Sequence, residues 1–308
     1  MLEQYNNQRV VEFGDEATFS GELKWGSNKL IHIDLEGFHP SGEQRNSIEW
    51  SCSNGSRVTT LNNTIYEDLI YPSFLIKGID LPEKYNGFLI RLSDVSEWLL
   101  LQSNFEMKDD YLIKKYPEQF FSVSVKKIDQ VELTISSQFQ CNLKKPADKQ
   151  DVTEIEEFCY IEVTYKKPQT LEYIVDEANR LRRLFTYVLG TPINIESLSL
   201  VEGKRTVSAI FNDVKVKRSM TSPFYAIINS SYLTENNLWE KLFQSFYDNK
   251  QYKRFNGLWS KFFGIMVDEG YWEHGVFSCV SLLEAYCSSY CRDIDEALPV
   301  EIFSALTE

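Results

Sequence analysis

The chain of 308 residues changes its hydrophobic pattern once, and this change limits the folds open to it. Between Phe19 and Asn212 most segments are short, rich in aromatic residues, and alternate apolar with polar positions. Between Asn236 and Glu308 apolar residues instead recur every three or four positions. Alternation is typical of strands with one buried face, and three-and-four spacing is typical of amphipathic helices. We therefore predict an α+β chain with a β-rich first part and a helical second part.

The strand signals of the first part are separated by short turns. Segments 21–25 and 29–38 flank Gly26-Ser27-Asn28, which is the arrangement of a hairpin. SIEWSC and RVTTL flank residues 53–56 in the same way. Further alternating segments lie at 87–95, 120–128, 130–139 and 158–166. A series of this kind predicts an antiparallel sandwich or a barrel-like domain.

Two segments of the first part break the alternation. Pro72 interrupts residues 64–79, which predicts two extended pieces or an edge strand with a bend, because proline cannot donate to a strand ladder. The charged stretch 142–157 contains one proline and is predicted to be a loop.

One long helix is expected after Pro168. Apolar side chains recur there at helical spacing: Leu171, Ile174, Val175, Ala178, Leu181, Phe185, Val188 and Leu189. Gly190 stands where a helix C-terminal cap is expected. We expect this helix to pack lengthwise on the sheet.

The composition shifts after Ser222 and Pro223. Segments 236–250, 252–270 and 271–295 carry Leu, Phe, Trp and Tyr at helical spacing. We therefore expect a β-rich N-terminal domain over residues 1–222 and a helical region over residues 223–308.

The net charge of −13 argues against binding of nucleic acid through overall electrostatic attraction. A local group of basic residues is still a candidate nucleic-acid contact: Lys204, Arg205, Lys215, Lys217 and Arg218. The alternative is that these residues form a solvated edge or loop. No apolar run approaches the roughly 20 residues that cross a bilayer, and residues 1–16 lack the pattern of a signal peptide. We expect a cytoplasmic protein without membrane contact.

Motifs that carry chemistry are missing from the sequence. The three histidines, His32, His39 and His274, have neither metal-ligand nor relay spacing. The six cysteines show no CxxC pair, and there is no nucleophile elbow and no glycine-rich phosphate loop. We expect no metal and no cofactor, and we assign no catalytic motif to the chain.

Several patches, in order, resemble a known family: GELKWGSNKLIHIDLEGF, SRVTTLNN, YPSFLIKG, FLIRLSDVSEWL, and the stretch from YIEVTYKK to ESLSL. This series, over about residues 15–205, is similar to the N-terminal domain of ApeA-type HEPN proteins, which are bacterial antiphage defence factors. The later segments YKRFNGLWSKFFGIM and GVFSCVSLLEAYCSSYC resemble the linker helices and the first helix leading into the HEPN domain of that family.

The resemblance implies an abortive-infection protein whose N-terminal domain senses or restrains and responds to a phage protein. The HEPN domain, usually dimeric, would cleave RNA, such as tRNA, through an Arg-x4-6-His motif. Its histidine would act as acid and base, and its arginine would hold phosphate. None of the three histidines here follows an arginine at that spacing. Glu284 is the one candidate catalytic residue, as a helper, by resemblance.

Two explanations fit this departure. The chain ends inside a HEPN effector domain, so that residues 223–308 are linker and partial HEPN-like region, or the effector lies on a separate polypeptide. Two other readings stay open. One is a β-sandwich that binds carbohydrate or peptide, with a helical bundle behind it, and exposed coplanar aromatics on one sheet face would favour carbohydrate; the aromatics considered as contacts for a phage protein, such as Trp25, Trp50, Tyr71 and Phe74, are mostly expected in the core. The other is a nucleic-acid-binding protein that uses the basic group and the arginines of the long helix.

Overall fold

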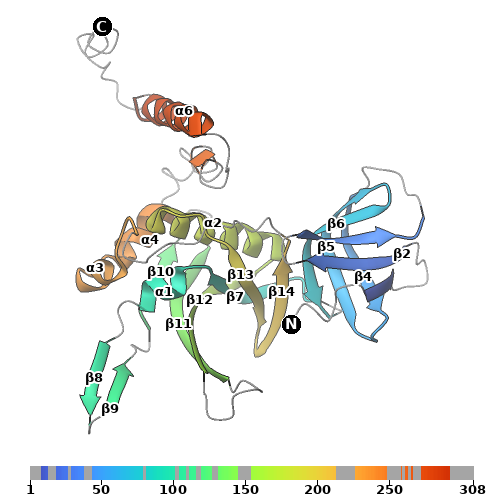
Figure 1. Ribbon diagram of the computed structural model, residues 1–308, viewed down its shortest axis with the longest axis horizontal. Coiled ribbons are helices and arrows are strands. Elements are labelled where there is room, and N and C mark those ends of the chain that lie inside the picture. Colours follow the sequence, from blue (N-terminus) through green and yellow to red (C-terminus); the bar gives the residue numbers. More distant parts are fainter. Residues whose placement is uncertain are drawn as a thin grey trace.

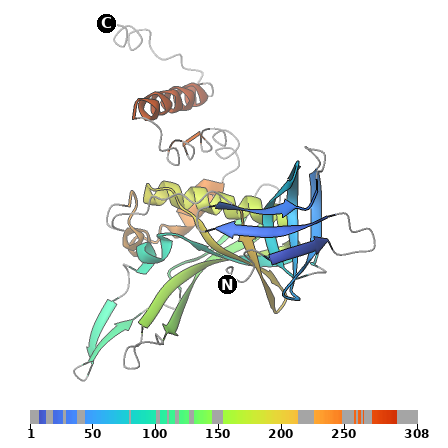
Figure 2. The same ribbon diagram turned by 45° about the vertical axis from the view of Figure 1, so that its right-hand side comes forward.

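The computed structural model describes residues 8–12, 19–26, 29–37, 44–78, 81–100, 104–108, 111–115, 119–126, 131–144, 154–212, 226–247, 258, 261–262, 265 and 272–291. Figures 1 and 2 show two β units side by side, with helices on one face of the second unit. The strands of both units are antiparallel and form one continuous ladder.

The first unit is a closed six-stranded barrel. Its strands are β1 (Gln8–Glu12), β2 (Ser20–Gly26), β3 (Lys29–Leu35), β4 (Gln44–Cys52), β5 (Arg57–Tyr66) and β6 (Leu69–Lys77). They pair in the order β6-β3-β2-β1-β4-β5, and β5 pairs back with β6 to close the ring. Alternate side chains fill the interior, among them Leu23, Ile33 and Ile65. The barrel option of the sequence prediction is therefore confirmed.

The second unit is an open six-stranded sheet. Its strands are β7 (Tyr85–Leu92), β10 (Ser122–Lys126), β11 (Glu132–Lys144), β12 (Glu154–Gln169), β13 (Ile195–Glu202) and β14 (Arg205–Phe211). Their order is β10-β11-β12-β7-β13-β14, and β14 continues the ladder into the barrel by pairing with β6. A separate hairpin is formed by β8 (Asn104–Lys108) and β9 (Tyr111–Lys115).

The prediction of a loop over residues 142–157 is wrong at both ends. Residues 142–144 extend β11, and residues 154–157 begin β12. The strand register of β11 and β12 continues as far as Lys144 opposite Glu154. Residues 145–153 lie outside the described part of the chain.

Strand β6 joins the two units. Its residues Leu69 and Ile70 pair with β3 of the barrel, whereas Phe74 to Ile76 pair with β14 of the sheet. Pro72 lies between these two sets, inside one continuous strand. The predicted break at Pro72 therefore corresponds to a change of strand partner, and the turn falls earlier, at residues 67–68.

Four helices cover one face of the sheet: α1 (Val95–Leu100), α2 (Leu171–Leu189), α3 (Ser230–Glu235) and α4 (Trp239–Tyr247). The predicted long helix is confirmed as α2, capped by Thr170 and by Gly190, whose φ is 72°. Trp98 of α1 packs edge-on against Phe185 and Trp239, at centroid distances of 6.0 Å and 5.6 Å. α3 and α4 follow the expected boundary at residue 222, and they contribute Leu233, Trp239 and Phe243 among others to the core of the sheet.

The described helix nearest the C-terminus is α6 (Trp272–Cys291). Several of its apolar side chains are exposed: Val276, Phe277, Val280 and Leu283. The helices expected over 252–270 lie mostly outside the described residues, and the HEPN-like region stays a prediction. Within the described residues, no helix combines the length and the apolar character needed to cross a membrane.

Candidate functional site

The face of the sheet opposite the helices is lined by small hydroxyl side chains. Strand register places Ser124 opposite Thr134, and Thr134 opposite Thr164, so one row runs across β10, β11 and β12. Because side chains alternate along a strand, all three lie on the face that α2 does not cover. Their neighbours Val125, Leu133 and Tyr165 are buried in the core. We name this surface the open face.

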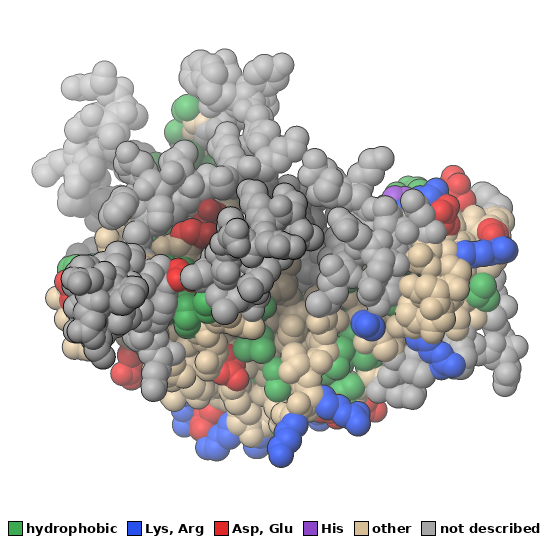
Figure 3. All heavy atoms as spheres, turned by 60° about the horizontal axis from the view of Figure 1, so that its bottom comes forward, with side chains coloured by type: hydrophobic (Ala, Val, Ile, Leu, Met, Phe, Trp, Pro, Cys, Tyr) green, Lys and Arg blue, Asp and Glu red, His purple; other side chains and the backbone are tan. Residues whose placement is uncertain are grey.

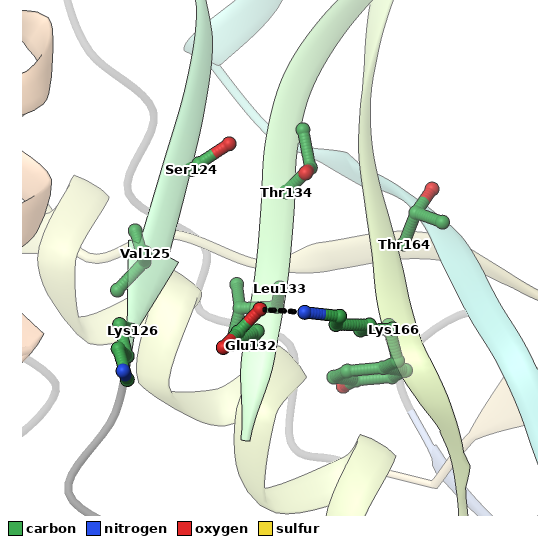
Figure 4. A pocket seen from close by; sticks show the side chains of 9 residues that line it. Ser124, Val125, Lys126, Glu132, Leu133, Thr134, Thr164 and Lys166 are labelled. Carbon is green, nitrogen blue, oxygen red and sulfur yellow. Dashed lines mark hydrogen bonds and ion pairs between the residues drawn. The ribbon is translucent and has the colours of Figure 1, made fainter. Parts of the chain in front are cut away.

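A hollow of about 550 Å³ lies on the open face (Figure 4). It is lined by Ser124, Val125, Lys126, Glu132, Leu133, Thr134, Thr164, Tyr165 and Lys166. Figure 4 shows the three hydroxyl residues in a row, with Lys166 directed at Glu132 from the neighbouring strand. The hollow is broad and open rather than a closed pocket, so it suits an extended ligand better than an enclosed small molecule.

One carboxylate and two ammonium groups border the hollow. Lys166 Nζ lies 2.6 Å from Glu132 Oε2, and this hydrogen bond, with a contribution from Lys126, lowers the pKa of Glu132. The carboxylate is therefore charged at neutral pH, and the border carries one positive charge in excess. Among the lining residues there is no histidine or cysteine to serve as base or nucleophile. The chemistry on offer is hydrogen bonding and ion pairing.

The hydroxyl character continues along the rest of the open face. Ser199 of β13 is paired with Leu89 on one side and with Ser208 of β14 on the other. Figure 3 turns the underside of Figure 1 toward the viewer, and charged side chains are seen there mostly along the rim. The described part of this face is thus a mixed surface of hydroxyls and scattered apolar groups.

A second hollow, of about 360 Å³, lies on the barrel and is lined by Arg9, Gly21, Glu22, Asp34, Leu35 and Glu36. Its charges are largely matched within the barrel. Arg9 Nη2 lies 3.1 Å from Glu36 Oε1, and Lys24 pairs with Asp34 and Glu22. Exposed ion pairs of this kind contribute little and offer few free groups to a ligand. We therefore take the hollow on the open face as the stronger candidate.

The predicted basic group is described only in part. Lys204 and Arg205 are exposed at the turn between β13 and β14, where the Gly203 amide donates to Asn86 Oδ1 at 2.8 Å. Lys215, Lys217 and Arg218 lie outside the described residues. The grouping of these five residues therefore stays a prediction.

Glu284 is exposed on α6, next to Leu283, which is 63% exposed. The only described histidine side chain is His32, which lies in the barrel with its Nε2 3.2 Å from Asp34 Oδ1. The described residues thus do not join Glu284 to a histidine, and its catalytic role stays a prediction.

Of the four aromatic residues considered as contacts for a phage protein, the three whose side chains are described do not form a surface platform of the kind that carbohydrate binding would also need. Trp50 is 0% exposed and Phe74 is 3% exposed, both inside the barrel region, while Tyr71 is 37% exposed. The side chain of Trp25 lies outside the described residues. Because Trp50 and Phe74 are buried, these two residues do not support the carbohydrate reading.

Sequence reasoning missed the hydroxyl row. Its signal is present in SVSVK and ELTISS, where serine and threonine occupy every second position. Polar residues at alternate positions are typical of any half-exposed strand, so the sequence does not indicate that three strands bring them together. The register supplies that information.

The described residues define an all-antiparallel barrel joined to a helix-backed sheet with an open polar face. Residues 12–238 match the sequence profile of the family described as ApeA N-terminal domain 1, and the chain belongs to this family. Membership suggests an antiphage defence protein, as the resemblance implied. No curated protein matches the chain.

One solved structure is similar over part of its length: MrkH, described as a novel c-di-GMP dependence transcription regulatory factor. It shares 13% identity, and the similarity covers 57% of this chain and 83% of that chain, with a TM-score of 0.17. A score this low supports no inference about fold or ligand.

Proposed function

We propose that the chain is the sensing and regulatory part of an abortive-infection protein that acts in the bacterial cytoplasm. The open face is the surface that recognises the trigger. The family match supports the defence role, and the hollow across β10, β11 and β12 is the observation that supports the site.

The trigger we propose is a polar, extended segment of a phage protein. Serine and threonine hydroxyls both donate and accept hydrogen bonds, so the row Ser124, Thr134 and Thr164 can satisfy a peptide backbone or polar side chains. Lys126 and the Lys166–Glu132 pair add charged partners at the border. Electrostatic and polar contacts of this type favour specificity over raw affinity.

The output we propose is control of a HEPN ribonuclease domain, carried by the same protein or by a partner, that works as a dimer and cleaves RNA such as tRNA. α3 and α4 are seated in the core of the sheet, and the chain leads from them toward α6. Lys204 and Arg205 are proposed as secondary contacts to nucleic acid. Because the chain carries a net charge of −13, we expect the effector domain to make the main contacts with nucleic acid.

Blocking the hollow tests the trigger site. Thr164→Tyr places a ring into the hollow from an exposed position, and Thr206→Tyr adds the same ring at an exposed position on β14. In bacteria that carry the defence gene, we expect Thr164→Tyr to lose protection in a phage plating assay and Thr206→Tyr to keep it. Equal protection by both variants, at equal protein levels, would contradict the proposal.

A further inference from the structure

Strand β12 connects the open face with the helices. Thr164, Tyr165 and Lys166 all border the hollow, but the Tyr165 side chain belongs to the core and the residue is 3% exposed, whereas its two neighbours are exposed. Alternation along the strand forces this division. An occupant that displaces β12 from the open side therefore also moves Tyr165 on the helix side.

Tyr165 ends in a buried hydroxyl that has no hydrogen-bond partner among the described residues. Its ring packs edge-on against Tyr173 of α2, with 5.8 Å between the ring centroids. Burial, and then the negative charge of Glu177, raise the pKa of Tyr165, so the hydroxyl keeps its proton and can donate. A buried donor without a partner is unfavourable, so the Tyr165 hydroxyl can compete for an acceptor that another buried hydroxyl holds, and such an exchange leaves the number of unpaired donors unchanged.

Glu177 lies four residues after Tyr173 on α2, one helical turn from the ring that Tyr165 packs against, and its carboxylate already accepts a hydrogen bond. The Glu177 side chain on α2 is 1% exposed, and its Oε1 accepts a hydrogen bond from the hydroxyl of Tyr247. Arg180 Nη1 lies 4.0 Å from Oε2, and the Arg180 guanidinium lies 5.3 Å from the centre of the Tyr247 ring. Tyr247 is the final residue of α4, so this one carboxylate ties the end of α4 to α2.

We propose that Glu177 is a shared acceptor through which the open face controls α4. In the arrangement seen here the Tyr247 hydroxyl donates to the Glu177 carboxylate, and the Tyr165 hydroxyl has no acceptor in the described part of the chain. When an occupant displaces β12, the Glu177 side chain turns to a rotamer directed at Tyr165, and the hydrogen bond to Tyr247 is lost. The inference rests on the proposed function, because it takes the open face as the trigger's site.

Loss of the hydrogen bond between Tyr247 and Glu177 would affect the C-terminal end of α4 and the part of the chain that follows it. α4 is anchored by Trp239 and Phe243, which stack at a centroid distance of 6.4 Å, and by the contact of Trp239 with Phe121 at 4.5 Å. Tyr247 is the anchor nearest to α6 in sequence among the described core residues. Its loss would free the C-terminal end of α4 first and leave the aromatic anchors in place.

Hydrogen exchange of the α4 amides in the 308-residue chain is the first test. Tyr247→Phe keeps the ring and removes the donor, and we expect exchange within residues 239–247 to be about tenfold faster, with the barrel unchanged. Tyr66→Phe removes a hydroxyl at a site 60% exposed and serves as the control, with no expected change. Unchanged exchange in Tyr247→Phe would overturn the proposal.

A covalent occupant of the hollow tests the relay. Thr164→Cys is labelled with fluorescein maleimide in a chain with serine in place of the exposed Cys141, Cys279 and Cys287 and also in place of Cys291. Cys52 and Cys159 stay in place, since burial raises the pKa of both thiols, that of Cys159 to about 12. We expect the label to accelerate α4 exchange several-fold.

Adding Tyr165→Phe to the labelled chain should abolish that acceleration. The substitution keeps the ring and removes only a hydroxyl without a partner at rest, so we expect this variant to fold like its parent. No acceleration in the labelled parent, or equal acceleration with and without the Tyr165 hydroxyl, would overturn the relay. Neither result depends on phage plating, so failure of the trigger site and failure of the relay can be told apart.

Discussion

Asn212 holds the two β units together at the point where the ladder branches. Its side-chain oxygen accepts from the Ile31 amide at 2.6 Å, and its Nδ2 donates to the carbonyls of Ile31 and Pro72 at 2.8 Å and 2.6 Å. Its backbone amide donates to Ser73 at 3.0 Å. One residue after β14 thus satisfies backbone groups of β3 and β6 where the partner of β6 changes.

Asn212→Ala should lower the free energy of unfolding by about 2–4 kcal/mol, because three side-chain hydrogen bonds are lost and part-buried backbone groups lose their partners. Urea denaturation followed by tryptophan fluorescence measures the change. Gln140→Ala, at an exposed position on β11, is the control and should shift stability by less than about 0.5 kcal/mol. Equal midpoints for the two variants would refute this role of Asn212.

Single residues also show where sequence reasoning reaches its limit. Most aromatics at these strand positions were expected in the core, and Trp50 and Phe74 are buried there. The sequence did not indicate Asn212, because its four partners lie on strands far away along the chain. The hydroxyl row was equally hidden, since only the register brings Ser124, Thr134 and Thr164 into line.

At the scale of elements, β7 and β12 approach each other too closely for a side chain at Gly87. A Cβ built on Gly87 would lie 2.1 Å from the carbonyl oxygen of Val163, which is backbone and has little room to move. The pairing of β12 with β7 is irregular just beyond this point, between Thr164 and Gln169. Gly87 thus permits the close approach of the strand that carries the hollow.

Gly87→Ala should therefore destabilise the sheet by about 1–3 kcal/mol through backbone displacement. The effect should appear as a lower midpoint in thermal unfolding. Ser208→Ala, at an exposed position on β14, is a comparison substitution without this clash and should stay near the parent. A Gly87→Ala variant as stable as Ser208→Ala would contradict this prediction, because it would show that β7 and β12 can move apart at Gly87 without loss of stability.

Element types were predictable where the local signal is complete. α2 has its apolar spacing, Thr170 before it and Gly190 after it, and all three are visible in the sequence. The choice between sandwich and barrel was not predictable, since it depends on whether β5 returns to β6. Residues 142–144 and 154–156 were predicted as loop because their charged sequence hides a non-local effect, the continued pairing of β11 with β12.

At the scale of the whole molecule, the family match over residues 12–238 spans the barrel, the sheet and helices α1 to α3. The structure shows this part as one ladder, with a core of helices on one side and the open face on the other. α6 was predictable as a helix from its spacing, but its spacing does not say what packs against it. Its exposed Phe277 and Leu283 illustrate that gap, because periodicity identifies a face and not its partner.

The central claim is that the hollow on the open face, and not the open face as a whole, contacts a phage protein during infection. A photo-crosslinking amino acid at position 164, in the hollow, tests this most directly, with position 206 on β14 as the matched control. In infected cells irradiated before lysis, we predict an adduct between position 164 and a phage-encoded polypeptide, absent from uninfected cells and from position 206. Absence of any phage adduct at position 164, or equal adducts at both positions, would contradict the claim.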